Sequence, residues 1–308
     1  MRVGVTGGTG FIGQYLIRDY EKEYDFVVPV RNWNHTLEQS HNTVYVKSDF
    51  SAQNLADIFK GCDAVIHLAA KVMPKKKIAL RMEEYMQNVV CAANVFEACK
   101  ETGIKNIICT STRSIFGDRK KSQSLTIAED DQPSPMDEYA VSKLCVETLA
   151  DFYHRTYGMN ITTYRISEVC GMDLTRGMLN PFWSVVLNAV GEKKAVPLYG
   201  TGSGGRDLIY VKDVTRALIM GLKKKKNGVF HIGSGHITTN KEIAEAFCEV
   251  FDNKAGIEFY PEKPEWGINQ CLNVEKARRE LGYETIYDIL KIVRDIQKES
   301  VYASFSKG

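Results

Sequence analysis

The chain has 308 residues, of which 44% are hydrophobic and 25% are charged, values typical of a globular protein with a buried core. Its formal net charge of +2 gives no support for broad electrostatic binding to nucleic acid. No apolar run approaches the ~18–20 residues that span a bilayer, so we expect no membrane segment.

The cysteines and the first residues indicate the compartment. None of the eight cysteines forms a Cys-x-x-Cys pair, and several lie in apolar strand or helix patterns, which favours buried reduced thiols and gives no metal site. The opening stretch MRVGVTGG reaches glycine too early for a secretory signal peptide. We therefore expect a cytoplasmic protein.

Short apolar runs rich in valine and isoleucine alternate with helical patterns through the first half of the chain. The expected strands are residues 2–6, 26–30, 43–47, 64–69 and 106–111, and the expected helices are 11–22, 51–60 and 83–102. Near-continuous apolar runs suit strands buried on both faces, and strand–helix alternation produces right-handed βαβ units. The sequence predicts an α/β fold with a doubly wound parallel sheet.

A helix over about 137–157 and a strand over 160–166 extend this pattern, after which it weakens. Loops rich in Gly, Asn and Pro follow, and then smaller units and a helix, NVEKARREL, closed by Gly282. We assign residues 1–166 to the sheet domain, with 206–232 contributing, and 167–308 mainly to a smaller C-terminal α/β lobe. The lysine runs 75–77 and 223–226 are interpreted as solvated surface.

A glycine-rich turn joins the first strand to the first helix. Glycines 7, 10 and 13 allow a tight turn, close approach of a pyrophosphate, and close helix–strand packing, while the helix N-terminus offers free N–H groups. The strand before it and the helix after it make a plain glycine turn the weaker interpretation. The pattern predicts a Rossmann-like dinucleotide-binding domain. The cofactor residues expected at this turn are Gly7, Gly10, Phe11, Ile12 and Gly13.

The ends of the second and third strands should contact the adenosine. Arg31 stands where an acidic residue would bind the ribose 2′-hydroxyl, and an arginine accommodates a 2′-phosphate instead. This favours NADP over NAD, although a surface arginine after a strand is also common. Asp49 and Phe50 could contact adenine, and Asp49 could also cap the helix that follows.

Tyr139 and Lys143 are four residues apart, hence on one face of the helix predicted over 137–157. A neighbouring ammonium and a positively charged nicotinamide would favour the phenolate and lower the tyrosine pKa from its ordinary value of about 10. Tyr139 could then accept a proton from a carbinol while hydride leaves for the cofactor. Thr112, at the end of the preceding strand, would orient the same hydroxyl.

At this point the sequence resembles a known family, the extended short-chain dehydrogenase/reductases of the NAD-dependent epimerase/dehydratase type. The resemblance covers nearly the whole chain. It is carried in the first half by glycines 7, 10 and 13, HLAA (67–70), STRSIFG (111–117) and YAVSK (139–143). Segments similar to those of members that act on nucleotide sugars follow: YRISEVCG (164–171), YGTGSGGRDLIYVKDVTRAL (199–218), FHIGSG (230–235) and LNVEKARRELGY (272–283).

The resemblance implies roles for individual residues. Thr112, Tyr139 and Lys143 would form the catalytic set, and Tyr139 and Lys143 would also contact the cofactor. Asn88 would lie near the nicotinamide, and Arg206 would bind the substrate diphosphate through a guanidinium–phosphate pair. The residues expected to line the cofactor after the fourth strand are Leu68, Ala69 and Ala70. The helices 83–102 and 137–157 resemble those that pair in the family's homodimers.

Two positions depart from the family pattern. Glu168 stands where an asparagine facing the sugar nucleotide is usual, and a carboxylate there would repel a diphosphate unless it turns away. A second phosphate-binding arginine is common just before LNVEKARREL, but this chain has Asn269 and Gln270, with only Lys263 nearby. The identity of the substrate is therefore less certain than the catalytic class.

Three chemistries compete within such a family. A 4,6-dehydratase would need an acidic pair after the threonine, and Arg113 and Ser114 cannot protonate a leaving hydroxyl as acids do. We therefore favour a nucleoside-diphosphate-sugar 4-epimerase of the UDP-glucose/UDP-N-acetylglucosamine type, which makes and reduces a 4-keto intermediate with tightly bound NAD. The alternatives are an NADPH-dependent 4-ketosugar reductase, which Arg31 favours, and a non-catalytic dinucleotide-binding regulator.

Overall fold

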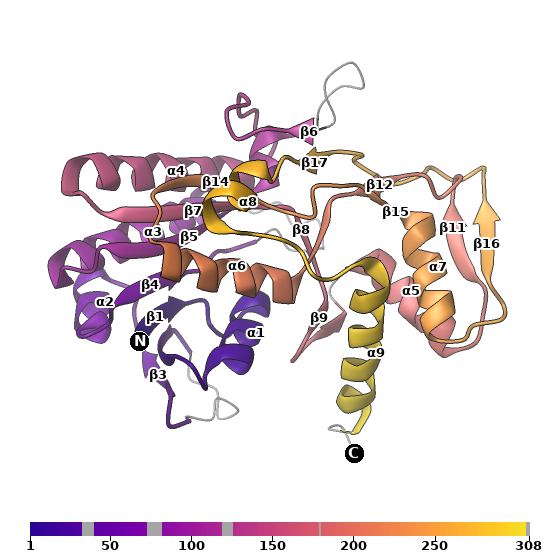
Figure 1. Cartoon of the computed structure of the whole chain (residues 1–308), viewed down its shortest axis with the longest axis horizontal. Helices are drawn as coiled ribbons and strands as arrows, with labels where there is room; N and C mark the ends of the chain where they lie inside the picture. Colours follow the sequence, from indigo (N-terminus) through magenta and orange to yellow (C-terminus); the bar gives the residue numbers. More distant parts are fainter. Residues whose placement is uncertain (33–39, 73–81, 119–125, 179, 306–308) are drawn as a thin grey trace.

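A seven-stranded parallel sheet forms the centre of one lobe of the molecule (Figure 1). The computed structural model describes residues 1–32, 40–72, 82–118, 126–178 and 180–305. The strands lie in the order β14-β7-β5-β4-β1-β2-β3. They are β1 (Arg2–Thr6), β2 (Asp25–Val30), β3 (Thr43–Lys47), β4 (Ala64–His67), β5 (Asn106–Thr112), β7 (Asn160–Ile166) and β14 (Gly228–Ile232).

This order confirms the predicted α/β fold with a doubly wound parallel sheet. The order reverses between β1 and β4, where the two directions of winding meet and where such sheets bind their ligands. The observed strands match the predicted ones closely, except that β4 stops at His67 and not at residue 69. The residues after His67 leave the sheet and are only partly buried, so they line the edge at which the strands end.

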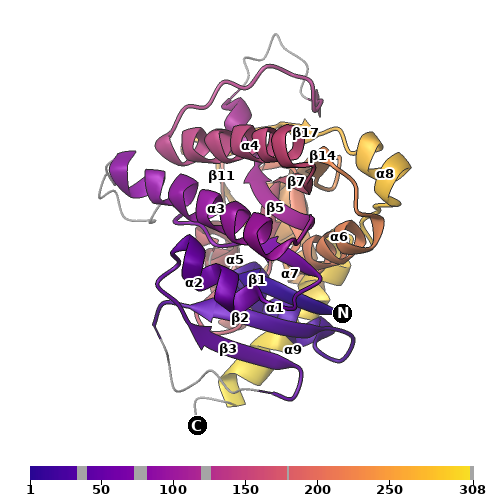
Figure 2. The same ribbon diagram turned by 90° about the vertical axis from the view of Figure 1, so that its left-hand side faces the viewer.

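Helices cover both faces of the sheet. On one face lie α2 (Ala52–Phe59), α3 (Met82–Thr102) and α4 (Glu138–Tyr157), which are seen together in Figure 2. On the other face lie α1 (Phe11–Tyr20), α6 (Val211–Lys224) and α8 (Glu275–Leu281). Each layer buries its apolar side chains against the strands, so the sheet is covered on both sides, as the continuous apolar strand runs predict.

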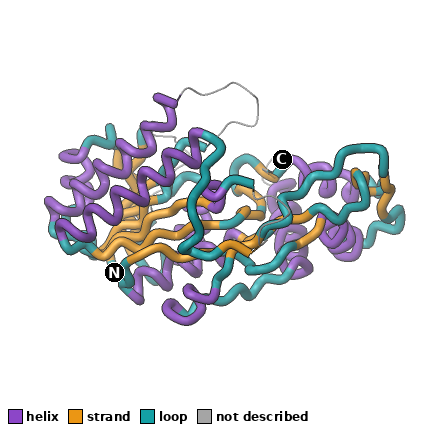
Figure 3. The backbone as a smooth tube through the Cα atoms, turned by 90° about the horizontal axis from the view of Figure 1, so that it is seen from above, coloured by secondary structure: helices purple, strands orange, loops and turns teal. Residues whose placement is uncertain are grey.

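The remaining elements form a second lobe beyond the carboxyl ends of the strands. Figure 3 shows the central strands running along the molecule toward this lobe. Its elements are β8 (Glu168–Cys170), β9 (Met172–Asp173), β10 (Gly177–Met178), α5 (Pro181–Gly191), β11 (Val196–Tyr199), β12 (Gly205–Arg206), β13 (Leu208–Tyr210), β15 (Thr238–Thr239), α7 (Asn240–Val250), β16 (Ile257–Tyr260), β17 (Cys271–Leu272) and α9 (Ile289–Phe305). They share a core of their own that includes Trp183, Val196 and Phe247.

Two short elements lie where the sheet meets this lobe. The 3₁₀ turn η1 (Arg113–Phe116) directly follows β5, and β6 (Thr126–Ile127) pairs with β17 of the second lobe. The segment between them includes residues 119–125, which lie outside the described part of the chain. The end of β5 is therefore placed against the second lobe.

The surface and thiol expectations can be compared with the described residues. Lysines 223–226 are exposed at the end of α6, as predicted, whereas the run 75–77 lies outside the described residues. All eight cysteines are free and most are buried, which agrees with the expected reduced thiols. No described helix is long and apolar enough to cross a bilayer.

Candidate active site

The glycine turn between β1 and α1 packs so closely against neighbouring backbone that Gly7 and Gly13 have no room for side chains. A Cβ on Gly7, whose φ is +74°, would lie 2.7 Å from the Ala69 nitrogen, and one on Gly13 would lie 2.4 Å from the Gly7 oxygen. Gly10 caps α1 without a side-chain hydrogen bond, so no side chain occupies the N–H groups of the first turn. This cradle of backbone donors fits the pyrophosphate of a dinucleotide.

At the place predicted to contact adenosine, Arg31 and Phe50 lie together. The Arg31 guanidinium lies 5.1 Å from the centre of the Phe50 ring, and Phe50 is buried with a φ of +64°. Asp49 is exposed and accepts a hydrogen bond from the Ser51 nitrogen at 2.8 Å, which lowers the pKa of this carboxyl. The expected cap role of Asp49 is wrong, because Ser51 caps α2 by accepting from the Asn54 nitrogen.

A buried hydrogen bond fixes the edge between β1 and β4. Thr6 Oγ1 and His67 Nδ1 are 2.7 Å apart, and burial lowers the pKa of His67 to about 3. The partly buried segment Leu68–Ala70 follows directly and packs against the glycine turn through Ala69. A neutral histidine therefore supports the wall predicted to line the cofactor, a role that the sequence motif did not reveal.

Asn88 connects two walls of the site. Its Oδ1 accepts from the Lys71 nitrogen at 2.6 Å, and its Nδ2 donates to the Lys71 oxygen and to Ser142 Oγ, both at 3.1 Å. Both amide hydrogens are therefore in use, and the side chain is buried. Asn88 holds the segment after β4 against α4, beside Tyr139 and Lys143.

Tyr139 and Lys143 lie in the first two turns of α4, which Asp137 caps by accepting from the Ala140 nitrogen. Lys143 is 3% exposed, and its Nζ donates to the Thr110 oxygen of β5 at 2.6 Å. Burial lowers the pKa of this ammonium. Tyr139 is partly buried, with its ring 6.5 Å from that of Tyr85 on α3.

The pKa of Tyr139 corrects one expectation. Burial, and then the charge of Asp137, raise it to about 12, so the phenol is protonated at neutral pH in the protein alone. The Lys143 ammonium is held at the Thr110 carbonyl and is not among the groups that shift Tyr139. The phenolate that a base requires would therefore depend on a further positive charge, such as that of an oxidised nicotinamide.

Thr112 is the last residue of β5 and caps η1. Its Oγ1 donates to Ser114 Oγ and accepts from the Ser114 nitrogen, each at 3.2 Å. Within the described structure no hydrogen bond joins Thr112 to Tyr139. Ser114 thus orients the Thr112 hydroxyl, and a substrate hydroxyl would be needed to connect the two residues.

On the side of the second lobe, Glu168 and Arg206 form an ion pair. Arg206 Nη1 lies 3.0 Å from each carboxylate oxygen of Glu168, and Asn180 Nδ2 donates to Glu168 Oε1 at 2.8 Å. The sequence pointed to a Glu168 that repels phosphate or turns away, and to a separate Arg206. Glu168 does neither of these, because it neutralises the arginine.

Asp207 lies between Arg206, the last residue of β12, and the start of β13, and its side chain fixes this part of the backbone. Its Oδ1 accepts from Ser234 nitrogen and Oγ, both at 2.7 Å, and its Oδ2 accepts from the Leu272 nitrogen at 3.0 Å. Arg206 Nε is itself buried and has no hydrogen-bond partner, although it can donate. The guanidinium is therefore held on one side by Glu168 and retains donors for an acceptor on the other.

Arg113 enters the same region from the turn after Thr112. Its Nη1 donates to Gln270 Oε1 at 2.9 Å and to the Gly117 oxygen at 3.4 Å. Burial lowers its pKa, while Asp118, Glu168 and Asp207 act in the opposite direction. The contact spans 157 residues of sequence, and no short-range signal predicts it.

The positions that replace the second family arginine have other partners. Asn269 Oδ1 accepts from the Gly205 nitrogen at 2.7 Å. The Lys263 ammonium lies over the rings of Tyr199 and Tyr260, at 4.6 and 4.5 Å from their centres. Gln270 instead meets Arg113, so the described cations of this region are Arg113 and Arg206.

A comparison with family models gives one match over most of the chain. The model of the NAD dependent epimerase/dehydratase family matches residues 3–233. The chain belongs to this family. It is an NAD-dependent enzyme of the extended short-chain dehydrogenase/reductase type, within a family of nucleotide-sugar epimerases and dehydratases.

Individual relatives of the family differ in length and activity. The chain is 28% identical to a trifunctional UDP-glucose 4,6-dehydratase/3,5-epimerase/4-keto-L-rhamnose-reductase of Arabidopsis thaliana, covering 91% of this chain but only 44% of that protein. It is 26% identical to a UDP-glucose 4-epimerase of Halalkalibacterium halodurans, covering 94% of this chain and 92% of that one. The structure of a UDP-N-acetylglucosamine 4-epimerase from Bacillus cereus superposes with a TM-score of 0.82 at 27% identity, covering 97% and 98% of the two chains.

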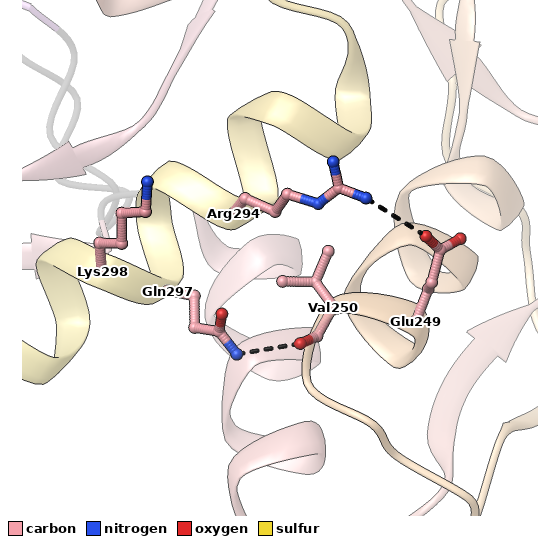
Figure 4. Close-up of a pocket in the computed structure, with 5 residues that line it drawn as sticks. All are labelled: Glu249, Val250, Arg294, Gln297 and Lys298. Carbon is pink, nitrogen blue, oxygen red and sulfur yellow. Dashed lines mark hydrogen bonds and ion pairs between the residues drawn. The ribbon is translucent and has the colours of Figure 1, made fainter.

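A hollow elsewhere on this family member is unrelated to the site. Figure 4 shows it between α7 and α9, lined by Glu249, Val250, Arg294, Gln297 and Lys298. Gln297 donates to the Val250 oxygen at 2.9 Å, and Arg294 pairs with Glu249 at 3.7 Å. Its lining contains none of the expected site residues. Among the side chains that the structure describes, no cluster of three His, Cys, Asp or Glu residues is placed to hold a metal.

Proposed function

We propose that the chain is a nucleoside-diphosphate-sugar 4-epimerase of the UDP-glucose/UDP-N-acetylglucosamine type. One observation carries this proposal: Thr112 and Tyr139 stand at the end of β5 and the start of α4, and Arg113 and Ser114 follow the threonine without an acid. Such a set can interconvert a carbinol and a ketone. It lacks the carboxyl pair that would expel water from the neighbouring carbon.

The proposed chemistry uses Tyr139 as the proton carrier. A bound dinucleotide would supply the acceptor for the hydride from C4 and return that hydride to the other face of the 4-ketosugar. Tyr139 would accept the O4 proton as the carbinol becomes a ketone and would give it back when the ketone is reduced. Thr112 would orient O4. The Lys143 ammonium, held at the Thr110 oxygen, would keep a positive charge close to Tyr139.

The remaining assignments are part of the same proposal. Residues 1–166 with 206–232 would bind the dinucleotide through the glycine turn, Arg31, Asp49–Phe50, Leu68–Ala70 and Asn88. Residues 167–308 would mainly bind the sugar nucleotide, with Arg206 on its diphosphate and Glu168 holding that arginine. We also infer a homodimer through α3 and α4.

A second candidate is an NADPH-dependent 4-ketosugar reductase. Its support is Arg31, which is exposed at the end of β2 and could meet a 2′-phosphate. An epimerase retains its cofactor through the cycle, whereas a reductase must exchange it. The two candidates therefore differ in what the purified protein carries.

The deciding experiment denatures the purified protein and identifies any released dinucleotide. UDP-glucose and UDP-N-acetylglucosamine are then followed by NMR without added cofactor. The epimerase proposal expects bound NAD and formation of the C4 epimer. Turnover that requires added NADPH and a ketosugar would establish the reductase.

A pair of matched variants assigns the proton carrier. Tyr139→Phe should lower turnover by at least about 100-fold, because the contribution of general acid–base catalysis is about 10²–10⁴-fold. Tyr153→Phe, the same change on the same helix, should leave turnover near that of the parent, since its hydroxyl bonds to Glu97. Full binding of dinucleotide by both variants with no turnover by the parent would instead support the non-catalytic regulator.

A further inference from the structure

Arg113, directly after β5, interacts electrostatically with the Glu168–Arg206 ion pair but is not part of it. Glu168 pairs with Arg206 through Nη1, with side-chain exposures of 31% and 14%. Arg113 makes no ion pair with any described residue. Its hydrogen bonds go to neutral acceptors, Gln270 Oε1 and the Gly117 oxygen.

The charge of Arg113 is only partly compensated in the protein alone. Arg113 is partly buried, and burial has the largest effect on its pKa, which it depresses. Three acids attract Arg113 without forming an ion pair with it, and Asp118 contributes the largest attraction. The other two have partners of their own, because Glu168 holds Arg206 and Asp207 accepts from Ser234 and Leu272. Arg206 acts in the opposite direction and repels Arg113. An anionic ligand would relieve this imbalance.

The place of Arg113 indicates which part of a ligand would carry the anion. Arg113 directly follows Thr112, and neighbouring Cα atoms are about 3.8 Å apart. Thr112 is the residue proposed to orient O4. Two substituents flank O4 on the sugar ring, the hydroxyl on C3 and the C6 group on C5, and of these only C6 can be a carboxylate while the ring is retained. A charge at C6 would therefore fall beside Arg113, whereas the diphosphate would lie with Arg206.

We propose that the sugar of the substrate carries a carboxylate at C6 and that Arg113 binds it, so that the enzyme acts on a nucleoside-diphosphate uronic acid. This inference rests on the proposed 4-epimerase function and narrows its substrate class. Glu168 neutralises Arg206. The positive charge that remains without an ion-pair partner is therefore that of Arg113, the residue proposed to lie beside the sugar. A neutral hydroxymethyl group would leave Arg113 without a counter-ion.

The test compares sugars that differ only at C6. Calorimetry measures the binding of UDP-glucose, UDP-glucuronate and UDP alone. The same is done for UDP-N-acetylglucosamine and for its counterpart with a carboxylate in place of the C6 hydroxymethyl group. A hydrogen bond to a charged group corresponds to about a 10- to 100-fold preference, so the uronate of at least one pair should bind that much more tightly than its neutral partner. UDP alone reports the contribution of the diphosphate.

Two variants separate the two arginines. Arg113→Gln should reduce the preference for the uronate by about tenfold or more and affect UDP much less. Arg206→Gln should weaken UDP, the neutral sugar and the uronate to similar extents. Arg113→Lys retains the charge and should restore part of the preference. Unfolding temperatures of all variants show whether the chain still folds.

The inference is overturned if the parent binds the neutral sugars as tightly as the uronates. It also fails if Arg113→Gln weakens UDP and both sugars equally, because Arg113 would then be a phosphate ligand or a structural residue. Epimerisation at C4, followed by NMR, tests the underlying function independently. Epimerisation of UDP-glucose without a preference for the uronate would retain the function and reject the inference. Uronate binding that depends on Arg113, without epimerisation at C4, would support the carboxylate site and reject the proposed function.

Discussion

His67 is held neutral at the end of β4. Its ring is fully buried against Thr6, and burial lowers its pKa to about 3, whereas a histidine in the unfolded chain titrates near 6.5. Between about pH 6.5 and pH 3, His67 binds a proton in the unfolded state but not in the folded state. The stability contributed by the neutral ring is therefore complete at higher pH and is lost as the pH falls.

We predict that lowering the pH from about 7 to about 5 removes about 2 kcal/mol of folding stability through His67. His67→Asn, which retains a polar contact to Thr6, should lose correspondingly less over that interval. Urea unfolding of parent and variant at both pH values measures the difference. Identical pH dependence in the two proteins would show that the ring is not kept neutral.

Gly13 has no room for a side chain. A Cβ would lie 2.4 Å from the Gly7 oxygen and 2.5 Å from Gly8 Cα. Gly13→Ala should therefore displace the turn, cost about 1–3 kcal/mol of stability and weaken dinucleotide binding at least tenfold, as measured by calorimetry. Gly191→Ala at the end of α5 is the control, because a Cβ there meets nothing within 4 Å. Equal behaviour of the two variants would contradict the close packing of the turn.

At single residues, the sequence predicted which side chains share a helix face better than it predicted contacts that depend on distant parts of the chain. Tyr139 and Lys143 share a helix face because their spacing is local, as expected. The cap of α2 moved from Asp49 to Ser51, since several residue types compete for a helix start within one turn. The raised pKa of Tyr139 depends on burial by distant parts of the chain, which spacing does not encode.

A buried ion pair attaches α4 to the sheet. Arg165 of β7 donates to Glu147 through Nη2 at 2.8 Å and through Nε at 3.1 Å, and the two side chains are 7% and 6% exposed. Arg165 also donates to the Glu129 oxygen at 2.8 Å. The pair therefore helps to position the helix that carries Tyr139 and Lys143.

Removal of one partner should be strongly destabilising. Glu147→Ala leaves a buried guanidinium without its counter-ion, and we expect a loss of about 3–5 kcal/mol in urea unfolding. The double variant Glu147→Leu/Arg165→Met removes both charges at similar volume and should be clearly more stable than the single variant. A single variant that unfolds like the parent would show that water reaches the pair.

Most elements of residues 1–166 were predicted from the sequence, whereas most of the later ones were not. The central strands up to β7 follow from continuous apolar runs and the helices up to α4 from periodic patterns, so their observed bounds lie within a few residues of the predicted ones. Helices α5, α7 and α9 were not predicted, although they are 11 to 17 residues long. The strands of the second lobe, such as β8 and β13, have only three residues each and form through pairing with distant partners. The Glu168–Arg206 pair depends on that pairing, because it joins the residue that begins β8 to the one two positions before β13.

For the whole molecule, the outer surface of α3 and α4 is the proposed dimer interface. Met86 and Val90 on α3, and Phe152 and Tyr157 on α4, are 38–49% exposed although apolar or aromatic. Figure 2 shows the two helices side by side on one face. Apolar side chains gathered on such a face are typical of a surface that is covered by another chain.

We expect light scattering at micromolar concentration to give twice the chain mass of 34.7 kDa. Val90→Glu should shift the protein to the monomer, because a carboxylate buried in an interface has no counter-ion there. Val185→Glu on α5 is a matched control, since Val185 is similarly exposed at 47% but lies in the second lobe. A monomeric parent would reject the proposed dimer.

Several hydrogen bonds join the sheet to the second lobe around Asp207. The Asp207 carboxylate accepts from the Ser234 and Leu272 nitrogens, and its backbone oxygen accepts from the Glu168 nitrogen at 3.1 Å. The backbone nitrogen of the adjacent Ser167 donates to the Ile232 oxygen at 2.9 Å. Thr112 lies in the same row of the sheet as Ile166, which in turn pairs with Ile232. In evolutionary terms, a second lobe inherited from a relative would need to match the first half at this cluster, at the pairing of β6 with β17, and where Tyr15 and Arg18 meet Glu299. Recombination at its edges would change the sugar that is recognised while the residues proposed for proton transfer stay in place.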